Sequence, residues 1–364
     1  MPPGSAGVHL FTPFECRDVT ARNRVVVSPM CQYSCESEDG LATDWHLAHL
    51  GSRAAGGAGI VMTEAAAVTP EGRISPQDLG IWSDDHAEAL EPITEHIAAQ
   101  GALSGIQLAH AGRKGSTRRP DDGGGPIHGD SGWTPVGPTD EPWPHDEPLD
   151  VEALDADGVE RVRDAFVDAA VRSVDAGFDV LELHAAHGYL LHEFLSPVTN
   201  AREDEYGGSF ENRTRLLREV VEDVRDAVPS GTPVFVRVSA TDWLPERDSW
   251  TVEDSARLGG ELSALGVDLV DVSAGGIHPE QQVPDTGAHY QVPYAEQVAE
   301  SGVAVGAVGK ITTPEGADEI IRNGRAELAI VGREHLRDPY FAIRAARELG
   351  HEAPVPRQYT RGFQ

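Results

Sequence analysis

The stretch VRSVDAGFDVLELHAAHG (171–188) contains one copy of the unit that decides the fold. Its first half has the apolar spacing of an amphipathic helix, which we expect over residues 159–176, and Gly177 is typical of a helix C-terminus. Its second half is almost continuously apolar, as a strand buried on both faces requires, and predicts a strand over residues 180–186. The stretch therefore predicts a helix followed by a buried parallel strand.

The same alternation recurs along the whole chain. Short apolar segments predict further strands over residues 25–30, 59–65, 104–110, 234–240, 269–274, 303–309 and 328–333. Amphipathic segments predict further helices over residues 44–55, 84–100, 211–228, 251–265, 291–300, 314–323 and 339–349. About eight strand–helix units predict an α/β protein with one closed (β/α)8 TIM barrel of parallel strands, as a single domain over residues 1–364. An open doubly wound sheet is the alternative, although its GxGxxG turn is absent from the sequence.

The charge balance excludes two classes of partner. The 364 residues include 60 acidic and 29 basic side chains, which gives a formal net charge of −31. Such a surface repels nucleic acid and anionic lipid, so we expect neither nucleic acid nor membrane as a partner. Lys114 and Lys310 are the only lysines, and the acidic charge is spread along the chain. Adaptation to concentrated salt explains this pattern; an ordinary acidic protein with arginine-biased codon usage is the alternative.

Cysteine content and hydropathy indicate the compartment. Cys16, Cys31 and Cys35 form no CxxC pair, and an odd number argues against a disulfide framework. The N-terminus lacks the basic start and apolar run of a secretory signal, and no apolar stretch is long enough to span a bilayer. We therefore expect a cytoplasmic protein of a salt-adapted organism.

One long irregular stretch interrupts the alternation. Residues 112–150 follow the third predicted strand and are rich in proline, glycine and aspartate. Loops that follow barrel strands lie on the catalytic face, so this stretch predicts a lid or rim loop. A surface insertion without a role in catalysis is the alternative.

Polar residues follow the fourth predicted strand, at the barrel end where active sites are built. His184 and His187 could donate two N–H groups to one carbonyl oxygen and stabilise the enolate that forms when a nucleophile adds to the β-carbon. Tyr189 could then protonate the α-carbon, with simple packing under the loop as the alternative. Zinc bound by the two histidines is a less favoured reading, because no third protein ligand is evident, and we expect no metal.

Other strand ends indicate a phosphate-bearing cofactor. Gly309, Gly332 and Arg333 follow the seventh and eighth strands, the usual phosphate position in these barrels. Arg237 would face the barrel interior, where a buried arginine needs an anion, either on a ligand or on an internal carboxylate. Gln107 can donate and accept at once, which suits an imide-like N–C=O pattern.

Together these residues resemble the Old Yellow Enzyme family of FMN-dependent ene-reductases, and more closely its bacterial, thermophilic-like branch. The matching stretches are SPMCQYS (28–34), GIQLAHAGRK (105–114), HAAHGYLLHEFLSPVTNAREDEYGGSFENR (184–213), VRVSA (236–240), AVGKI (307–311), GREHLRDP (332–339) and QYTRGF (358–363). The resemblance implies that NADPH or NADH reduces a bound FMN. The reduced flavin would then reduce the carbon–carbon double bond of an α,β-unsaturated carbonyl compound or a nitroalkene.

The resemblance also implies roles for individual residues. The residues that would contact FMN are Ser28, Pro29, Met30, Cys31, Ala65, Gln107, Arg237, Gly309, Gly332 and Arg333. Those that would act on an enone substrate are His184, His187 and Tyr189 as catalytic residues, with Tyr33 as a second contact. Arg361, in a tail over residues 350–364, would reach the active site of a neighbouring subunit, which implies a homodimer or homotetramer.

Three other functions stay open. A Schiff-base lyase on the same barrel would use Lys310 as its nucleophile. An enzyme similar to the 2,4-dienoyl-CoA reductases would lack their iron–sulfur domain, because no cysteine cluster follows the barrel. A protein that only stores FMN would leave the histidine pair and Tyr189 without a use.

Overall fold

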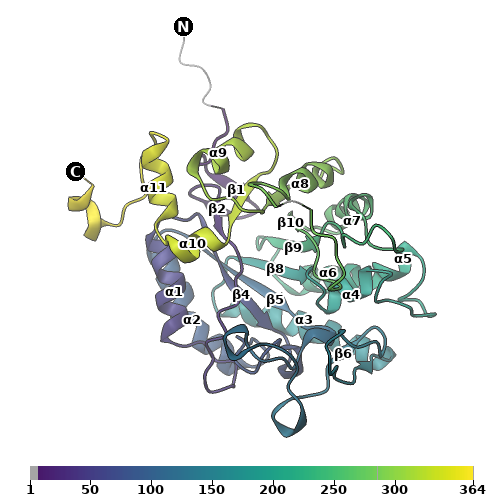
Figure 1. Ribbon diagram of the computed structural model, residues 1–364. Helices are drawn as coiled ribbons and strands as arrows, with labels where there is room; N and C mark the ends of the chain where they lie inside the picture. Colours follow the sequence, from purple (N-terminus) through teal and green to yellow (C-terminus); the bar gives the residue numbers. More distant parts are fainter. Residues whose placement is uncertain (1–6, 285, 364) are drawn as a thin grey trace.

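The computed structural model describes residues 7–284 and 286–363, in which eight parallel strands close into a barrel (Figure 1). The strands are β3 (Val25–Val27), β4 (Ile60–Ala67), β5 (Leu103–Ala109), β8 (Val180–Ala185), β9 (Val234–Ser239), β10 (Leu269–Ser273), β11 (Val305–Ala307) and β12 (Leu328–Val331). Neighbours in the ring follow chain order, and β12 pairs with β3 to close it. The predicted TIM barrel is confirmed, and the open sheet is wrong. The first and last residues of the predicted domain and the end of the predicted tail lie outside the described residues.

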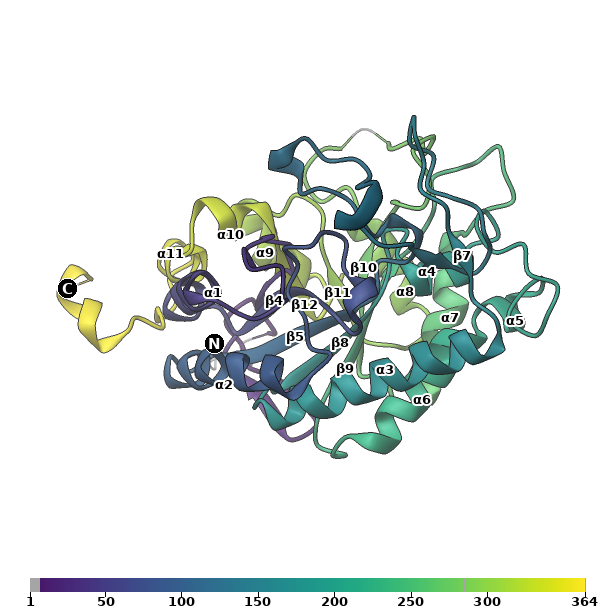
Figure 2. The ribbon, with the colours of Figure 1, turned by 90° about the horizontal axis from the view of Figure 1, so that it is seen from below.

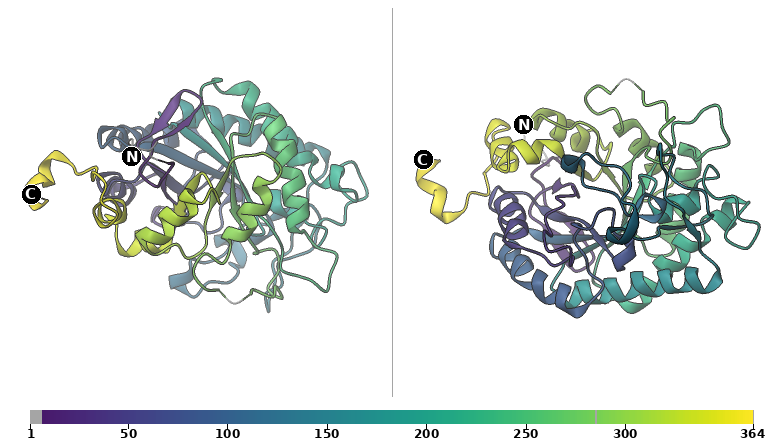
Figure 3. Two further views of the ribbon diagram at one scale, coloured as in Figure 1. Left: turned by 90° about the horizontal axis from the view of Figure 1, so that it is seen from above. Right: turned by 60° about the horizontal axis from the view of Figure 1, so that its bottom comes forward.

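Helices surround the strands (Figure 3). They are α1 (Asp44–Ala55), α2 (Asp84–Ala99), α3 (Ala156–Asp175), α6 (Arg215–Ala227), α7 (Val252–Ala264), α8 (Val292–Ala299), α9 (Pro314–Arg322) and α11 (Phe341–Glu348). Two short helices, α4 (Leu190–Leu195) and α10 (Arg333–Arg337), do not stand out in the sequence, and the helix predicted over residues 211–228 is divided into α5 (Phe210–Arg213) and α6. Helices α4 and α10 are six residues or fewer, too short to show a helical period. Among residues 7–284 and 286–363, no helix is long and apolar enough to cross a membrane.

Local signals explain where the helices begin. The Thr251 side chain accepts a hydrogen bond from the backbone of Asp254, whose carboxylate bonds back to the backbone of Thr251, so a capping box starts α7. Thr313 caps α9, and Pro314 takes the first helical position, where no N–H is needed. Gly177, after α3, has φ +86°, a left-handed conformation that ends the helix and turns the chain into β8.

Two apolar clusters hold the barrel together. One fills its interior with inward-facing side chains such as Ile60, Val180 and Phe235, and the other fills the space between strands and helices. A hairpin of β1 (Phe14–Cys16) and β2 (Val19–Ala21), which is too short to stand out in the sequence, packs against the interior cluster. Figure 1 places this hairpin at the end of the barrel opposite β6 (Val136–Gly137). The hairpin covers that end of the barrel.

The irregular stretch 112–150 lies at the open end. It contains three short turns, η2 (Gly112–Lys114), η3 (Pro120–Asp122) and η4 (Gly129–Ser131), and β6 pairs with β7 (Glu152–Ala153). Arg119 donates to the backbone oxygen of Tyr33, after β3, at 3.2 Å. Arg113 donates to the backbone oxygen of Ile277, after β10, at 2.9 Å. These contacts hold the stretch over the carboxyl ends of the strands.

The C-terminal segment leaves the barrel. After α11 the chain forms one further turn, η5 (Arg357–Gly362), and Figure 2 shows it projecting away from the strands. The hydroxyl of Tyr359 lies 3.4 Å from that of Tyr340, and Arg347 lies over the ring of Phe363. Arg361 is exposed on this turn, away from its own barrel.

Candidate functional site

A pocket of about 460 Å³ opens at the carboxyl ends of the strands, a volume typical of cofactor and ligand sites. The residues predicted to bind cofactor or substrate that line it are Ser28, Met30, His187, Arg237, Gly309, Gly332 and Arg333. Segments from β3, β8, β9, β11 and β12 thus meet at one place.

One end of the pocket is suited to an anionic group. Gly309 has φ +119°, and a Cβ there would lie 2.9 Å from the backbone nitrogen of Gln291, so the close approach requires glycine. At Gly332 the nearest atom to an added Cβ is 3.7 Å away, which leaves the backbone open to the pocket. Arg333 and Lys310 bring positive charge to the same end, where Arg337 also lies, paired with Glu334 at 3.0 Å.

Arg237 occupies the floor of the pocket. Its Nε lies 3.3 Å from the carboxylate of Asp271, and its Nη1 donates to the hydroxyl of Ser28 at 3.4 Å. The sequence left open whether Arg237 meets an internal carboxylate or a ligand. The structure allows both, because Arg237 contacts the buried Asp271 and also lines the pocket. Burial raises the pKa of Asp271, and the Arg237 guanidinium opposes that rise.

A second buried carboxyl lies behind Arg237. Glu182 accepts a hydrogen bond from Nε2 of Gln107 at 2.7 Å, so one end of that amide is engaged by the protein itself. Burial, and then the charge of Asp271, raises the pKa of Glu182 to about 8. Burial therefore favours the protonated form of Glu182 at neutral pH. Sequence reasoning missed both acids, although a charged residue inside an apolar strand is a signal that could have found them.

The histidine pair lies where β8 ends. Nδ1 of His184 accepts from the backbone N–H of Ala186 at 3.2 Å, which places the ring proton on Nε2. That Nε2 is 3.4 Å from Nδ1 of His187, and Nε2 of His187 is 2.7 Å from the hydroxyl of Ser273. Burial, reinforced by Arg237, holds the pKa of both histidines well below the usual value. Both imidazoles are neutral at pH 7 and each carries one N–H, which faces Nδ1 of His187 in the case of His184 and the Ser273 hydroxyl in the case of His187.

A metal at this pair is not supported. Among residues 7–284 and 286–363, no group of three or more histidine, cysteine, aspartate or glutamate side chains could hold an ion. The nearest polar partner of His187 is instead a serine hydroxyl, at 2.7 Å. The arrangement therefore suits hydrogen-bond donation to an oxygen.

Tyr189 lies beside His184 with the two rings edge to face and their centroids 5.0 Å apart. It borders a small cavity of about 10 Å³, which Ala65 also lines. Burial raises the pKa of Tyr189 well above its usual value, so the phenol keeps its proton at neutral pH. The ammonium of Lys114 lies 5.1 Å from the centre of its ring and donates to the backbone oxygen of His187 at 2.7 Å. These contacts hold Tyr189 and His187 together.

The remaining predicted residues lie at the edge of this region. Pro29, Cys31 and Tyr33 are half-buried on the segment that follows β3. Burial raises the pKa of the Cys31 thiol, so it stays protonated and is a poor nucleophile. Arg361 is far along the chain on η5 and is not part of the pocket of its own chain.

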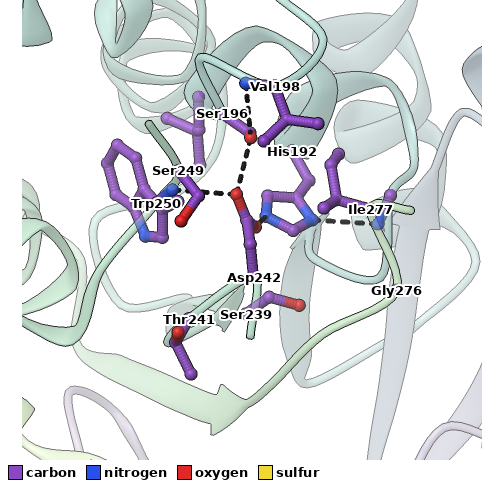
Figure 4. Close-up of polar contacts among 12 residues, drawn as sticks. His192, Ser196, Val198, Ser239, Thr241, Asp242, Ser249, Trp250, Gly276 and Ile277 are labelled. Atoms are coloured by element: carbon purple, nitrogen blue, oxygen red, sulfur yellow. Dashed lines mark hydrogen bonds and ion pairs between the residues drawn. The ribbon is translucent and has the colours of Figure 1, made fainter. Parts of the chain in front are cut away.

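The turn that carries His187 and Tyr189 has a buried support (Figure 4). Nδ1 of His192, on α4, accepts from the backbone N–H of Gly188 at 2.9 Å, and its Nε2 lies 3.0 Å from Oδ1 of Asp242. Oδ2 of Asp242 accepts from the Ser196 hydroxyl at 2.7 Å and from the Trp250 backbone N–H at 2.8 Å. His192 and Asp242 are fully buried, so they fix the backbone of the turn. The sequence offers no signal that His192 and Asp242, 50 residues apart, are partners.

Lys310 does not have the environment of a Schiff-base lysine. It is exposed, and its ammonium donates to the Thr286 hydroxyl at 2.7 Å. Reactive lysines are desolvated or placed beside another cation, which makes the free amine accessible at neutral pH. The geometry therefore does not favour the lyase.

Comparisons with known proteins agree with this site. The sequence model of the NADH:flavin oxidoreductase / NADH oxidase family matches residues 9–352. The chain is 46% identical to an NADPH dehydrogenase of Geobacillus thermodenitrificans over 98% of both chains, and 46% identical to one of Bacillus subtilis over 97% of this chain and 99% of the other. Among solved structures it is similar to an old yellow enzyme homologue from Zymomonas mobilis (TM-score 0.77, 27% identity, 95% and 94% of the two chains). It is also similar to a morphinone reductase in complex with tetrahydroNAD (TM-score 0.75, 25% identity, 95% and 92%).

Proposed function

Because this chain belongs to the NADH:flavin oxidoreductase / NADH oxidase family, in its Old Yellow Enzyme branch, we propose that it is an ene-reductase for α,β-unsaturated carbonyl compounds and nitroalkenes. It is a flavin oxidoreductase whose cofactor is FMN and whose electron donor is a nicotinamide coenzyme. Bound FMN supplies the two-electron chemistry, which takes a hydride from the coenzyme and gives it to the substrate. The observation that carries the proposal is the pair of neutral imidazoles beside a protonated, half-buried tyrosine.

The residues present fit FMN. Arg237 presents a guanidinium to the pocket and would meet the N1–O2 edge of the flavin, where negative charge gathers on reduction. Gly309, Gly332 and Arg333 would hold the phosphate at the positively charged end. The other residues proposed to line the ring system are Ser28, Pro29, Met30, Cys31, Ala65 and Gln107.

We expect Arg333→Ala to weaken FMN binding about tenfold. A charge-assisted contact to phosphate is worth about 1.5–3 kcal/mol, and the exposure of Arg333 reduces this through solvent screening. The measurement is fluorescence titration of apoprotein with FMN and, as the matched control, with riboflavin, which has no phosphate. Riboflavin affinity should not change. An equal loss for both ligands would contradict the phosphate role.

The chain's own groups explain how an enone would be activated. The N–H groups of His184 and His187 would turn from each other and from Ser273 toward the substrate oxygen and stabilise the negative charge that develops there. Because both rings are neutral, they stabilise this charge without protonating the oxygen in the ground state. Tyr189 would supply the proton to the α-carbon, and Tyr33 would be a second substrate contact.

An anaerobic titration tests the proposal. Purified protein in molar salt is mixed first with NADPH and then with cyclohexenone while the flavin absorption is recorded. We expect the flavin band to bleach with NADPH and to return with the enone. A protein that has no flavin band and does not take up FMN, or a reduced flavin that cyclohexenone cannot reoxidise, would contradict the proposal.

Tyr189→Phe should slow one half of this cycle only. We expect reoxidation by cyclohexenone to fall about 10²-fold or more, because the α-carbon loses its proton donor while the ring stays in place. Reduction by NADPH involves no such proton and should change little. Stopped-flow absorption resolves the two steps. Equal slowing of both would refute the proton-donor role.

We propose that the active unit is a homodimer or homotetramer in which Arg361 reaches the site of a neighbouring copy. The exposed position of η5, which projects away from its own barrel, supports this arrangement. The net charge of −31 and the presence of only two lysines support a cytoplasmic enzyme of a salt-adapted organism. The same charge makes nucleic acid and membrane poor partners, which leaves small-molecule enones as the proposed ligands.

A further inference from the structure

Another buried acid, Asp78, shares the small cavity with Tyr189. Its side chain is 3% exposed, and both residues line the cavity of about 10 Å³. Every other lining residue of this cavity is alanine, glycine or isoleucine. Asp78 and Tyr189 are therefore the only groups on its wall that can give or take a proton.

One oxygen of Asp78 holds its own loop and the other is free. Oδ2 accepts from the backbone N–H of Ile74 at 2.6 Å. Oδ1 is buried and has no hydrogen-bond partner, which is uncommon for a buried polar atom. A cavity of this volume holds about one water molecule, and such a water could bond to Oδ1 and to the phenol together.

The environment of Asp78 makes it an acid rather than a carboxylate. Burial raises its pKa to about 8, against the opposing effect of the Ile74 N–H and with the help of the nearby Glu64. At pH 7 the carboxyl group keeps its proton. The titratable groups that face it are Glu64 from β4, Arg73 from its own loop, Cys31, Tyr33 and Cys35 from the segment after β3, and Tyr189.

We propose that Asp78 returns a proton to Tyr189 after each turnover, through the cavity that the two residues share. This inference rests on the proposed role of Tyr189 as proton donor. Tyr189 gives its proton to the α-carbon and becomes a phenolate, and its raised pKa makes that phenolate a strong base. The carboxyl O–H of Asp78 breaks, and its proton passes through one water to the phenolate oxygen. The Asp78 carboxylate is then protonated again from solvent, on the side of its loop where Glu71 is exposed. These steps move protons only, and no group changes its oxidation state.

The substitution Asp78→Asn tests the return of a proton to Tyr189 separately from the transfer of a proton from Tyr189 to the substrate. Asparagine keeps an oxygen for the Ile74 N–H but carries no acidic proton. In a single turnover, Tyr189 starts protonated, so reoxidation of the reduced enzyme by cyclohexenone should stay within about twofold of the wild-type rate. In steady state, turnover with cyclohexenone should fall about tenfold, because each cycle waits for a new proton. Turnover with ferricyanide, which needs no proton from Tyr189, should not change.

The pH profile gives a second readout. Wild-type turnover with cyclohexenone should fall as pH rises through about 8, where Asp78 loses its proton, and this limb should be absent in Asp78→Asn. Lys114, which lies over the Tyr189 ring, is a second group that could cause such a limb, because burial lowers its pKa to about 8 as well. A limb that persists in Asp78→Asn would therefore belong to another group and would overturn the inference.

Glu64→Gln is the matched control. Glu64 is also buried, but its oxygens are engaged by the backbone N–H of Gln32 at 2.7 Å and by His46 at 3.1 Å, and it does not line the cavity. Below pH 7 its turnover with cyclohexenone should stay within about twofold of wild type, because it supplies no proton. Loss of its charge lowers the pKa of Asp78, so the alkaline limb should move to lower pH and persist. Unchanged steady-state turnover in Asp78→Asn, or equal slowing of its single turnover and steady state, would overturn the inference. An unchanged single turnover in Tyr189→Phe would instead overturn the proposed function on which it rests.

Discussion

Replacing His184 with alanine should lower turnover of cyclohexenone about 10²–10³-fold while the purified protein keeps its FMN. A donor aimed at a developing oxyanion is worth about 2.7–4 kcal/mol of transition-state stabilisation, and His184 is buried where water cannot replace it. His184 does not line the large pocket, so flavin binding should persist. In the proposed cycle its Nε2–H must leave Nδ1 of His187, 3.4 Å away, to reach the substrate oxygen. The measurements are the flavin absorption of the purified variant and its steady-state rate with NADPH and cyclohexenone.

His184→Asn is the control for this prediction, because an asparagine amide also carries an N–H donor. We expect it to recover part of the loss. The rate of flavin reduction by NADPH must be recorded separately, because the coenzyme and the enone use the same site in the proposed cycle. Normal turnover of cyclohexenone by His184→Ala would show that the histidine does not stabilise the substrate oxygen.

Asp242→Ala should lower the free energy of unfolding by about 3–5 kcal/mol, because each buried donor that loses its acceptor costs about 1–3 kcal/mol. The substitution leaves Nε2 of His192, the Ser196 hydroxyl and the Trp250 N–H without their acceptor in a fully buried place. Urea unfolding at fixed salt and saturating FMN measures the change. Because the same carboxylate orients His192 against Gly188, turnover should fall as well.

Asp84→Ala provides the comparison for a surface charge. Asp84 pairs with Arg172 at 3.0 Å, but its side chain is 89% exposed. Exposed pairs contribute about 0–1 kcal/mol, so this variant should unfold nearly as the wild type does. If Asp242→Ala were no less stable than Asp84→Ala, the buried pair would not support the turn at Gly188 in the way that its contacts indicate.

The barrel was predictable because its signals are local. A run such as VLELHAA predicts a buried strand wherever it occurs, and Gly177 or Thr313 marks a helix end through its own backbone preference. Failures occurred where an element is too short for a period to show. The three-residue strands of the β1–β2 hairpin and the short helix α4 are examples.

The candidate site likewise has features that the sequence predicts and features that it does not. Strand ends brought Arg237, the histidines and Gly309 to one end of the barrel, because parallel strands present their carboxyl ends together. Whether Arg237 faces a ligand or a carboxylate could not be read from β9, because Asp271 lies on β10 and only barrel closure sets the two side by side.

The sequence by itself determined the eight-stranded barrel, the chemistry at the strand ends and the acidic surface, since each depends on residue type and on spacing along the chain. Only the tertiary structure decided which buried groups meet. Asp78 approaches Tyr189, and Asp242 approaches His192, across loops from different strands. The protonation of Asp78, Glu182 and Tyr189 also follows from burial, because desolvation depends on everything packed around a group and not on its neighbours in the chain.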